Sequence, residues 1–320
     1  MSNGMEHPFD DCKIGTCPMS EANFTYIPDL AGNVAYLTIF AVILVPQLYF
    51  GIRYKTWGYF VGMVGGIVLE IIGYVGRVQL HFNPFPFDPF LLYLICLTIG
   101  PAFLSAAIYL CLGRIVVVYG EGISRVQPRA YSILFISCDF LSLVLQAAGG
   151  ALAATGDTPA DGQTGVNIMI AGLSTQVVSL LLFIILGAEF AWRVRKHPDQ
   201  LDERFKSLRN TKLWTMFLVG LAVATVTIFI RCVFRVAELS SGFHGELFND
   251  EAAFMVLEGP MIIIACICLT IFHPGLIFRN TLADTNWSLR RKKQACYAHR
   301  RLDPVELTSD VGVSEDKASH

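Results

Sequence analysis

Charged residues are scarce in this chain of 320 amino acids, where Asp, Glu, Lys and Arg together make up 16% of the sequence. Hydrophobic residues make up 54%, and the mean hydropathy is +0.53. Soluble domains carry about 25% charged residues, so this composition excludes an ordinary soluble protein. The formal net charge of -2 contains no basic excess, and we therefore expect no nucleic-acid partner.

Two kinds of catalytic signature are also missing. The chain has no G-x-x-x-x-G-K-[ST] sequence, the common phosphate-binding loop, so it does not hydrolyse ATP by that route. Of its seven histidines only His273 lies near the end of an apolar run, which disfavours an intramembrane metal hydrolase. We expect no enzymatic activity, no cofactor and no bound metal.

The apolar residues that are present form seven long runs. A helix needs roughly 20 residues to cross a hydrocarbon layer about 30 Å thick. The runs extend over Ala31 to Ile52, Gly58 to Arg77, Phe90 to Val118, Tyr131 to Ala154, Val166 to Trp192, Lys212 to Val236 and Ala252 to Leu276. They predict an all-α, polytopic membrane protein with seven transmembrane helices in region 31–276, a first tail over 1–30, and a basic and then acidic tail over 277–320.

The positive charges lie in alternate connections between these runs. Lysine and arginine occur after the first, third and fifth runs, whereas the connections after the second, fourth and sixth runs have neither. Because positively charged loops stay preferentially in the cytosol, the pattern predicts an N-terminus outside and a C-terminus in the cytosol.

The two tails carry their own signals. Asn23 stands in an N-x-T glycosylation sequence on the side predicted to face outside. Cys12 and Cys17 lie in the same tail, where an oxidising compartment would allow a disulfide. In the C-terminal tail, either contact with anionic lipid or simple solvation explains the basic run of Arg290, Arg291, Lys292 and Lys293.

The second run combines a glycine stripe with two ionisable residues. Gly58, Gly62 and Gly66 recur every fourth residue, so they form one smooth face against which another helix can pack closely. Glu70 and Arg77 continue that face and should point into the bundle. A charge in the bilayer centre costs roughly 2.5–3.5 kcal/mol, so these residues predict either a substrate or proton site or a buried pair that holds helices in register.

Further polar residues interrupt the other runs. Counting helical rises from the predicted ends places most of them in the outer half of the membrane. We therefore predict a polar outer cavity, with Pro46, Pro101 and Pro260 expected to kink their helices. With Glu70 and Arg77, the candidate substrate-binding or ion-pair residues are Asp139, Gln146, Gln176, Arg231, Arg235, Glu238 and Glu258.

Short runs recur along the chain in a characteristic order. The longer ones are Glu70 to Arg77, Pro101 to Tyr109, Asp139 to Gly150 and Arg231 to Glu238, and the shorter ones are Tyr26 to Pro28, Gly172 to Gln176, Gly242 to Gly245, Glu251 and His273 to Gly275. In this order and spacing the chain resembles the fungal lipid-translocating exporter family from about Tyr26 to Gly275. It departs after Glu251, where Ala252 and Ala253 stand in a stretch that is often aromatic in the family.

The resemblance implies translocation or export of amphipathic lipids or lipid-like toxic compounds, with sphingoid long-chain bases favoured. It also implies a contribution to lipid asymmetry or to stress and drug resistance, and among the possible membranes we favour the plasma membrane over an internal one. Membrane lipids or amphipathic small molecules are the expected partners.

The residues fit that implication in two ways. A long-chain base carries an amine that Glu70, Glu238 or Glu258 could pair with, whereas Arg77 and Arg235 could bind a phosphate head group. If protons drive transport, Glu70 and Asp139 are the candidate carriers, because burial favours the protonated form of a carboxyl group.

A seven-helix lipid sensor or receptor without transport is the alternative. Seven spans with the N-terminus outside are also the layout of G-protein-coupled receptors. However, the third run ends in Gly113-Arg114-Ile115 rather than in the acidic-Arg-Tyr signature of common receptors, and no Asn-Pro-x-x-Tyr sequence occurs.

Glycosylation mapping tests the predicted topology. The chain has a second N-x-S sequence at Asn286, which the loop charges place in the cytosol. We expect no sugar at Asn286, whether or not Asn23 is modified, as measured by the mobility of Asn23→Gln and Asn286→Gln variants before and after glycosidase treatment. A glycosidase-sensitive shift that disappears in Asn286→Gln would contradict the topology.

Overall fold

The structure is a computed structural model that describes residues 26–120, 122–124, 127–155, 159–198, 201–240 and 247–278. These residues form helices and no strand. The helices are α1 (Leu30–Tyr54), α2 (Trp57–Phe82), α3 (Phe87–Tyr119), α4 (Pro128–Thr155), α5 (Pro159–Lys196), the 3-10 turn η3 (Glu203–Phe205), α6 (Lys206–Arg209), α7 (Lys212–Ser240), α8 (Glu251–Leu257), α9 (Gly259–Ile271) and α10 (Pro274–Ile277).

Seven spans in the described residues are long and apolar enough to cross a bilayer, with α8 to α10 counting as one. This confirms the predicted all-α fold with seven spans. Several helices extend beyond the predicted boundaries, most of all α5, because interfacial residues continue a helix past its apolar stretch.

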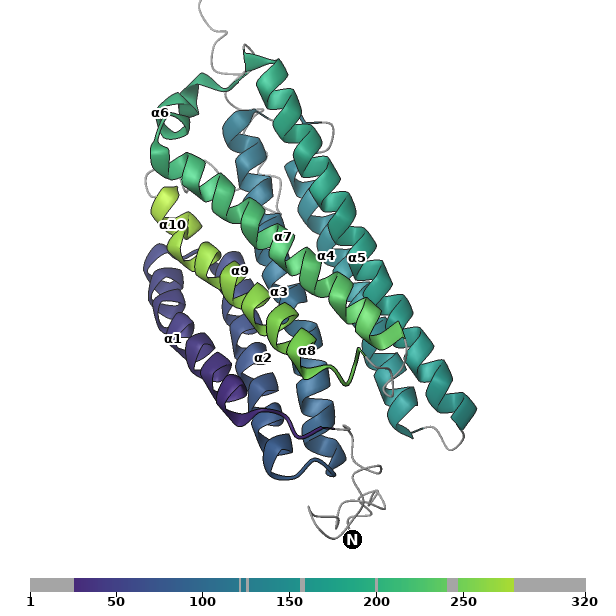
Figure 1. Cartoon of the computed structure of the whole chain (residues 1–320). Coiled ribbons are helices and arrows are strands. Elements are labelled where there is room, and N and C mark those ends of the chain that lie inside the picture. The colour runs from purple at the N-terminus through teal and green to yellow at the C-terminus, as the bar shows by residue number, and fades with distance from the viewer. Residues whose placement is uncertain are drawn as a thin grey trace, which may run out of the picture.

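The spans form a closed ring of neighbours (Figure 1). Each span contacts the next one along the chain, in the order α1, α2, α3, α4, α5, α7 and α9, and α9 also contacts α1. The third span also touches α5 and α7 and is the most buried of the seven. The first and last spans are therefore adjacent, and α3 lies at the centre of the bundle.

Close packing of α2 on α3 depends on the predicted glycine stripe. A Cβ atom on Gly62 would lie 2.9 Å from the backbone oxygen of Phe103, and one on Gly66 would lie 3.0 Å from that of Gly100. Side chains at these positions would push the two backbones apart. The stripe of Gly58, Gly62 and Gly66 faces α3, as predicted.

The seventh span differs from the single helix expected over Ala252 to Leu276, because it is broken before each of two prolines. The α-helix stops at Glu258, before Pro260, and again at Phe272, before Pro274. A proline ring has no N–H and clashes with the preceding turn. In contrast, α1 and α3 continue through Pro46 and Pro101.

Tyrosine hydroxyl groups from other helices replace lost hydrogen bonds near both breaks. The hydroxyl of Tyr36 donates to the carbonyl of Met255 at 2.6 Å, and that of Tyr59 donates to the carbonyl of Leu269 at 2.7 Å. Each break is thus fixed to α1 or α2, which holds Glu258 at a defined depth.

The connection between α5 and α7 packs against the end of α3. The backbone N–H of Asp202 donates to the carbonyl of Tyr119 at 3.2 Å. Nη1 of Arg209 donates to the carbonyl of Val118 at 2.9 Å. A cation beside the last carbonyls of a helix is stabilising, so this contact ties the central helix to the neighbouring connection.

Replacing Gly62 by leucine should separate α2 from α3. The clash involves backbone atoms, so we expect a loss of at least about 1–3 kcal/mol in stability, measured as a lower melting temperature of the purified protein. Gly187→Leu is the matched control, because no atom lies within 4 Å of a Cβ at Gly187. Equal melting temperatures for Gly62→Leu and the parent would contradict the role of the stripe.

Candidate functional site

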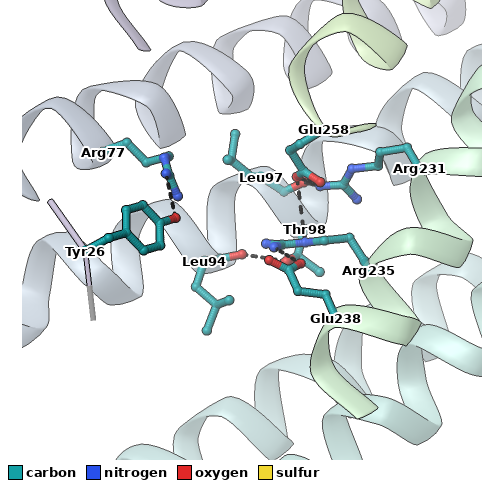
Figure 2. Close-up of polar contacts among 9 residues, drawn as sticks. All are labelled: Tyr26, Arg77, Leu94, Leu97, Thr98, Arg231, Arg235, Glu238 and Glu258. Atoms are coloured by element: carbon teal, nitrogen blue, oxygen red, sulfur yellow. Dashed lines mark hydrogen bonds and ion pairs between the residues drawn. The ribbon is translucent and has the colours of Figure 1, made fainter. Parts of the chain in front are cut away.

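Four ionisable residues form the polar centre of the bundle, the ion-pair cluster of Arg231, Arg235, Glu238 and Glu258 (Figure 2). The first three follow one face of α7, and Glu258 comes from the break between α8 and α9. Nη2 of Arg231 lies 2.5 Å from Oε1 of Glu258, and Nη1 of Arg235 lies 2.5 Å from Oε2 of Glu238. The Nε atom of Arg235 is 3.7 Å from Oε1 of Glu258, so the two pairs are joined.

The cluster is enclosed by protein. Its four side chains are at most 3% exposed. A water-filled cavity would leave them accessible, so the polar outer cavity expected from the sequence is not present at these residues, where the side chains pack against one another instead. Buried charges are costly unless they are paired, and this cost explains why all four residues take part in ion pairs.

A proline in the central helix supplies a further acceptor. Pro101 has no N–H and cannot bond to Leu97, the residue four positions earlier in α3. Nη2 of Arg231 donates to that Leu97 carbonyl (Figure 2). Pro101 therefore leaves the Leu97 carbonyl free to accept from a donor on α7, and the bond from Arg231 to this carbonyl connects α7 with α3.

The helix break places Glu258 at the N-terminus of α9. Glu258 is the cap residue of that helix and is 1% exposed. The unpaired N–H groups of a helix N-terminus favour a negative charge, so the position suits a carboxylate. The next residue, Gly259, is packed tightly, since a Cβ atom there would lie only 2.7 Å from the Tyr36 ring and 2.9 Å from the Tyr74 hydroxyl.

Glu70 lies beside the ion-pair cluster without joining its hydrogen bonds. It is 1% exposed on α2, and its Oε1 atom has no hydrogen-bond partner among the described residues. A Cβ atom on Gly100 of α3 would lie 2.8 Å from that oxygen. The charged groups that act on Glu70 are Arg231, Glu258 and Arg235. Glu70 is thus a carboxyl group at the margin of the cluster.

Arg77 has different partners. Its Nε donates to Oδ1 of Asn33 at 3.1 Å, and its Nη2 donates to the hydroxyl of Tyr26 at 3.2 Å. The guanidinium lies 3.8 Å from the centre of the Phe254 ring. Glu70 and Arg77 both point inward as predicted, but within the described residues no ion pair joins them. Arg77 instead connects α2 with α1, α8 and the segment before α1.

Asp139, Gln146 and Gln176 form a second polar group, separate from the ion-pair cluster. Oδ2 of Asp139 accepts hydrogen bonds from Ser105 at 2.7 Å and from Tyr109 at 2.9 Å. Nε2 of Gln146 lies 3.4 Å from Oε1 of Gln176. The structure therefore brings four of the nine predicted residues together in the ion-pair cluster and three in this second polar group, with Glu70 at the margin of the cluster and Arg77 apart from both.

Comparison with known proteins identifies the family. A sequence model described as "RTA1 like protein" matches residues 63–281. This match includes every residue of the ion-pair cluster and of the second polar group. The chain belongs to the RTA1-like family.

Three relatives in Saccharomyces cerevisiae illustrate the similarity. The sphingoid long-chain base transporter RSB1 is 35% identical over 281 residues, which cover 79% of this chain and 73% of its own. Protein RTA1 is 24% identical over 322 residues, covering 92% and 96%, and protein RTM1 is 29% identical over 228 residues, covering 71% and 70%. No solved structure matches the chain.

These findings make the RTA1-like chain a multi-pass membrane protein whose relatives include named transporters of lipid-like molecules. They confirm the resemblance seen in the sequence. A transporter name also fits the expectation that the chain is not an enzyme.

Sequence reasoning missed the neutral partners in this RTA1-like bundle. Asn33 and Tyr36 of α1 are single polar residues in an apolar run, and nothing in their spacing shows what they contact. Ser105 and Tyr109 lie four residues apart on α3, a helical spacing that could have been read as one polar face. Their shared partner Asp139 is on another helix, so the contact itself needed the structure.

Some predicted features lie outside the described residues. They are the glycosylation site Asn23, the disulfide candidates Cys12 and Cys17, and the basic run Arg290, Arg291, Lys292 and Lys293. They remain predictions from the sequence.

Removing one member of an ion pair should cost stability that is partly recovered when its partner is removed as well. Arg231→Met leaves Glu258 without its closest cation, so we expect a loss of about 3–5 kcal/mol in the free energy of unfolding. Combining it with Glu258→Gln should cost less than the sum of the single changes. Unfolding in detergent of the parent, Arg231→Met, Glu258→Gln and the double variant measures the coupling energy between Arg231 and Glu258. Strictly additive losses would contradict the pairing.

Proposed function

We propose that this protein translocates or exports amphipathic lipids across the plasma membrane, with sphingoid long-chain bases as the favoured class of cargo. Such transport contributes to lipid asymmetry or to resistance against toxic lipid-like compounds. The loop charges support an N-terminus outside, and the basic run Arg290 to Lys293 contacts anionic lipid at the cytosolic surface. The name of the relative RSB1 supports the cargo class.

The charge balance around Glu70 carries this proposal. The ion-pair cluster holds two arginines and two glutamates, and Glu70 adds a third carboxyl group. Arg77 is hydrogen-bonded to the neutral side chains of Asn33 and Tyr26 and forms no ion pair with Glu70 in the described part of the chain. Glu70 therefore has no cation in direct contact, and its ionised form would be stabilised by one. A proton or the amine of a long-chain base can supply it.

An amine suits this site better than a phosphate does. Each arginine of the cluster is already paired, Arg231 with Glu258 and Arg235 with Glu238. A phosphate head group would have to break one of these pairs and leave a buried carboxylate uncompensated, which is expensive. An ammonium group can bind Glu70 and leave both pairs intact.

Exchange of a proton for an amine at Glu70 gives a transport mechanism. Protonated Glu70 is neutral while no cargo is bound. When the amine binds, the carboxyl group releases its proton and the charge of the site is conserved. The break between α8 and α9 places Glu258 beside Glu70 inside the bundle, as discontinuous helices line the substrate sites of many transporters. The alkyl chain of the base meanwhile stays among apolar side chains.

The experiment is release of a fluorescent long-chain base from preloaded yeast that lack their own members of the family. Expression of the parent protein should accelerate release. Glu70→Gln should slow it by about tenfold or more at matched surface levels, because a hydrogen bond to a charged group contributes about 1.5–3 kcal/mol.

Asp88→Asn is the matched control, since it removes one exposed carboxylate near the same end of the bundle. Release that is fast in the parent, in Asp88→Asn and in Glu70→Gln alike would rule out Glu70 as the site. A folded parent protein that releases nothing would instead favour a different cargo or the sensor alternative.

A further inference from the structure

A tyrosine hydroxyl group next to Glu70 is buried without a hydrogen bond. Tyr74 follows Glu70 by four residues on α2, so the two side chains share one face of the helix. Tyr74 is fully buried, and its hydroxyl oxygen has no hydrogen-bond partner among the described residues. Buried tyrosine hydroxyl groups usually find a partner, so this one indicates a partner from outside the chain.

The break in the last span borders this hydroxyl group. A Cβ atom on Gly259 would lie 2.9 Å from the Tyr74 hydroxyl oxygen, so that oxygen packs against the residue that follows Glu258. The charged groups that act on the Tyr74 hydroxyl group are Glu70, Glu258, Arg77 and Arg231. Tyr74 therefore lies between the carboxyl group of its own helix and the one at the break.

Two carboxylate oxygens beside Tyr74 are unpaired as well. Oε1 of Glu70 and Oε2 of Glu258 have no hydrogen-bond partner in the described part of the chain, and each side chain is 1% exposed. The two carboxyl groups act on each other, and both act on Tyr74. Three neighbouring buried oxygen atoms, two from α2 and one from the break, thus lack a donor.

A proton does not complete this group of oxygens. None of the three is hydrogen-bonded to another, so a proton on Glu70 does not bridge to Tyr74 or to Glu258 in this arrangement. The missing partner has to reach several oxygens at once, and a group with more than one donor hydrogen does so.

We propose that Glu70, Tyr74 and Glu258 together bind a primary ammonium group, and that Tyr74 makes the site selective against N-methylated amines. This inference rests on the proposed function, because the ammonium group is that of the long-chain base. A primary ammonium carries three N–H donors, one for each oxygen. Its charge balances Glu70, while Oε1 of Glu258 stays paired with Arg231.

The number of donors sets the selectivity. A trimethylammonium group has the same charge but no N–H, so it would leave all three oxygens unpaired. A site built to hydrogen-bond its ligand strongly rejects an analogue that lacks the donors. Backbone also closes two sides of the site, since a Cβ atom on Gly100 would lie 2.8 Å from Oε1 of Glu70 and one on Gly259 would lie 2.9 Å from the Tyr74 oxygen. A methyl group does not fit there.

Binding to the purified full-length protein in detergent tests the selectivity. The two probes are a radiolabelled sphingoid base with its free primary amine and the N,N,N-trimethyl derivative of the same base, which keeps the charge and the alkyl chain. We expect the parent protein to bind the primary amine at least about 100-fold more tightly than the trimethyl derivative.

Tyr74→Phe isolates the hydroxyl group. The ring keeps its contacts with Tyr36 and Phe40, whose ring centres lie 5.5 and 5.7 Å away. Affinity for the primary amine should fall about tenfold and affinity for the trimethyl derivative should stay the same, so the ratio of the two affinities falls about tenfold. Without ligand, the variant should melt no lower than the parent, because the hydroxyl group makes no hydrogen bond among the described residues.

Tyr59→Phe is the matched control. It also removes a buried hydroxyl group from α2, but one that donates to the carbonyl of Leu269. The variant should melt at a lower temperature than the parent and keep the parent's ratio of affinities. A merely structural effect of losing a tyrosine hydroxyl group would appear in the melting temperature and not in the ratio.

The possible failures are distinguishable. Equal affinity of the parent for both probes, or an unchanged ratio in Tyr74→Phe, would overturn the selective site and leave the proposed transport standing. A lower melting temperature of Tyr74→Phe without ligand would show that the hydroxyl group is satisfied inside the protein, which also overturns the site. A folded parent that binds neither probe would overturn the inference together with the proposed cargo class.

Discussion

A carbonyl group inside a bilayer needs a donor from the protein, because no water is present to provide one. Each proline within a span removes such a donor, and in this chain side chains from other helices donate to a carbonyl before Pro101 and to carbonyls near the two breaks of the last span. Arg231 donates to Leu97, four residues before Pro101, while tyrosines from α1 and α2 donate to Met255 and Leu269 near the two breaks of the last span. The need to satisfy the backbone therefore determines where α7, α8 and α9 contact the rest of the bundle.

Buried charges also need partners inside the bundle, and leaving one unpaired costs more free energy than leaving a carbonyl group unpaired. Two arginines of α7 are stable in the bundle because two glutamates neutralise them, and one of those glutamates stands at a helix N-terminus created by a break. Among the described residues, Glu70 and Asp139 are the buried carboxyl groups left outside these pairs, the first beside the ion-pair cluster and the second bonded to Ser105 and Tyr109 of α3.

Much of this arrangement could be predicted from the sequence. Hydrophobic run length identified the seven spans, and glycine spacing identified the face of α2 that packs on α3. The inward direction of Glu70 and Arg77 followed from helical periodicity. Periodicity cannot tell which helices are neighbours, so it could not separate Asp139 from the ion-pair cluster or show Arg77 with Asn33. It also treated Pro260 as a kink, because the break depends on Tyr36 being available to donate to a released carbonyl.

The adjacency of α1 and α9 has a consequence for biogenesis. The oxygen of Gln47 on α1 accepts a hydrogen bond from Thr270 on α9 at 3.3 Å, and among the described residues the carboxylate paired with Arg231 comes from Glu258. Both partners are synthesised last. A nascent chain with six spans inserted therefore holds an amide and a guanidinium in lipid without their final partners, and a chain terminated before Glu258 keeps them so. The polar contacts of the bundle are therefore complete only once the seventh span has packed against the other six.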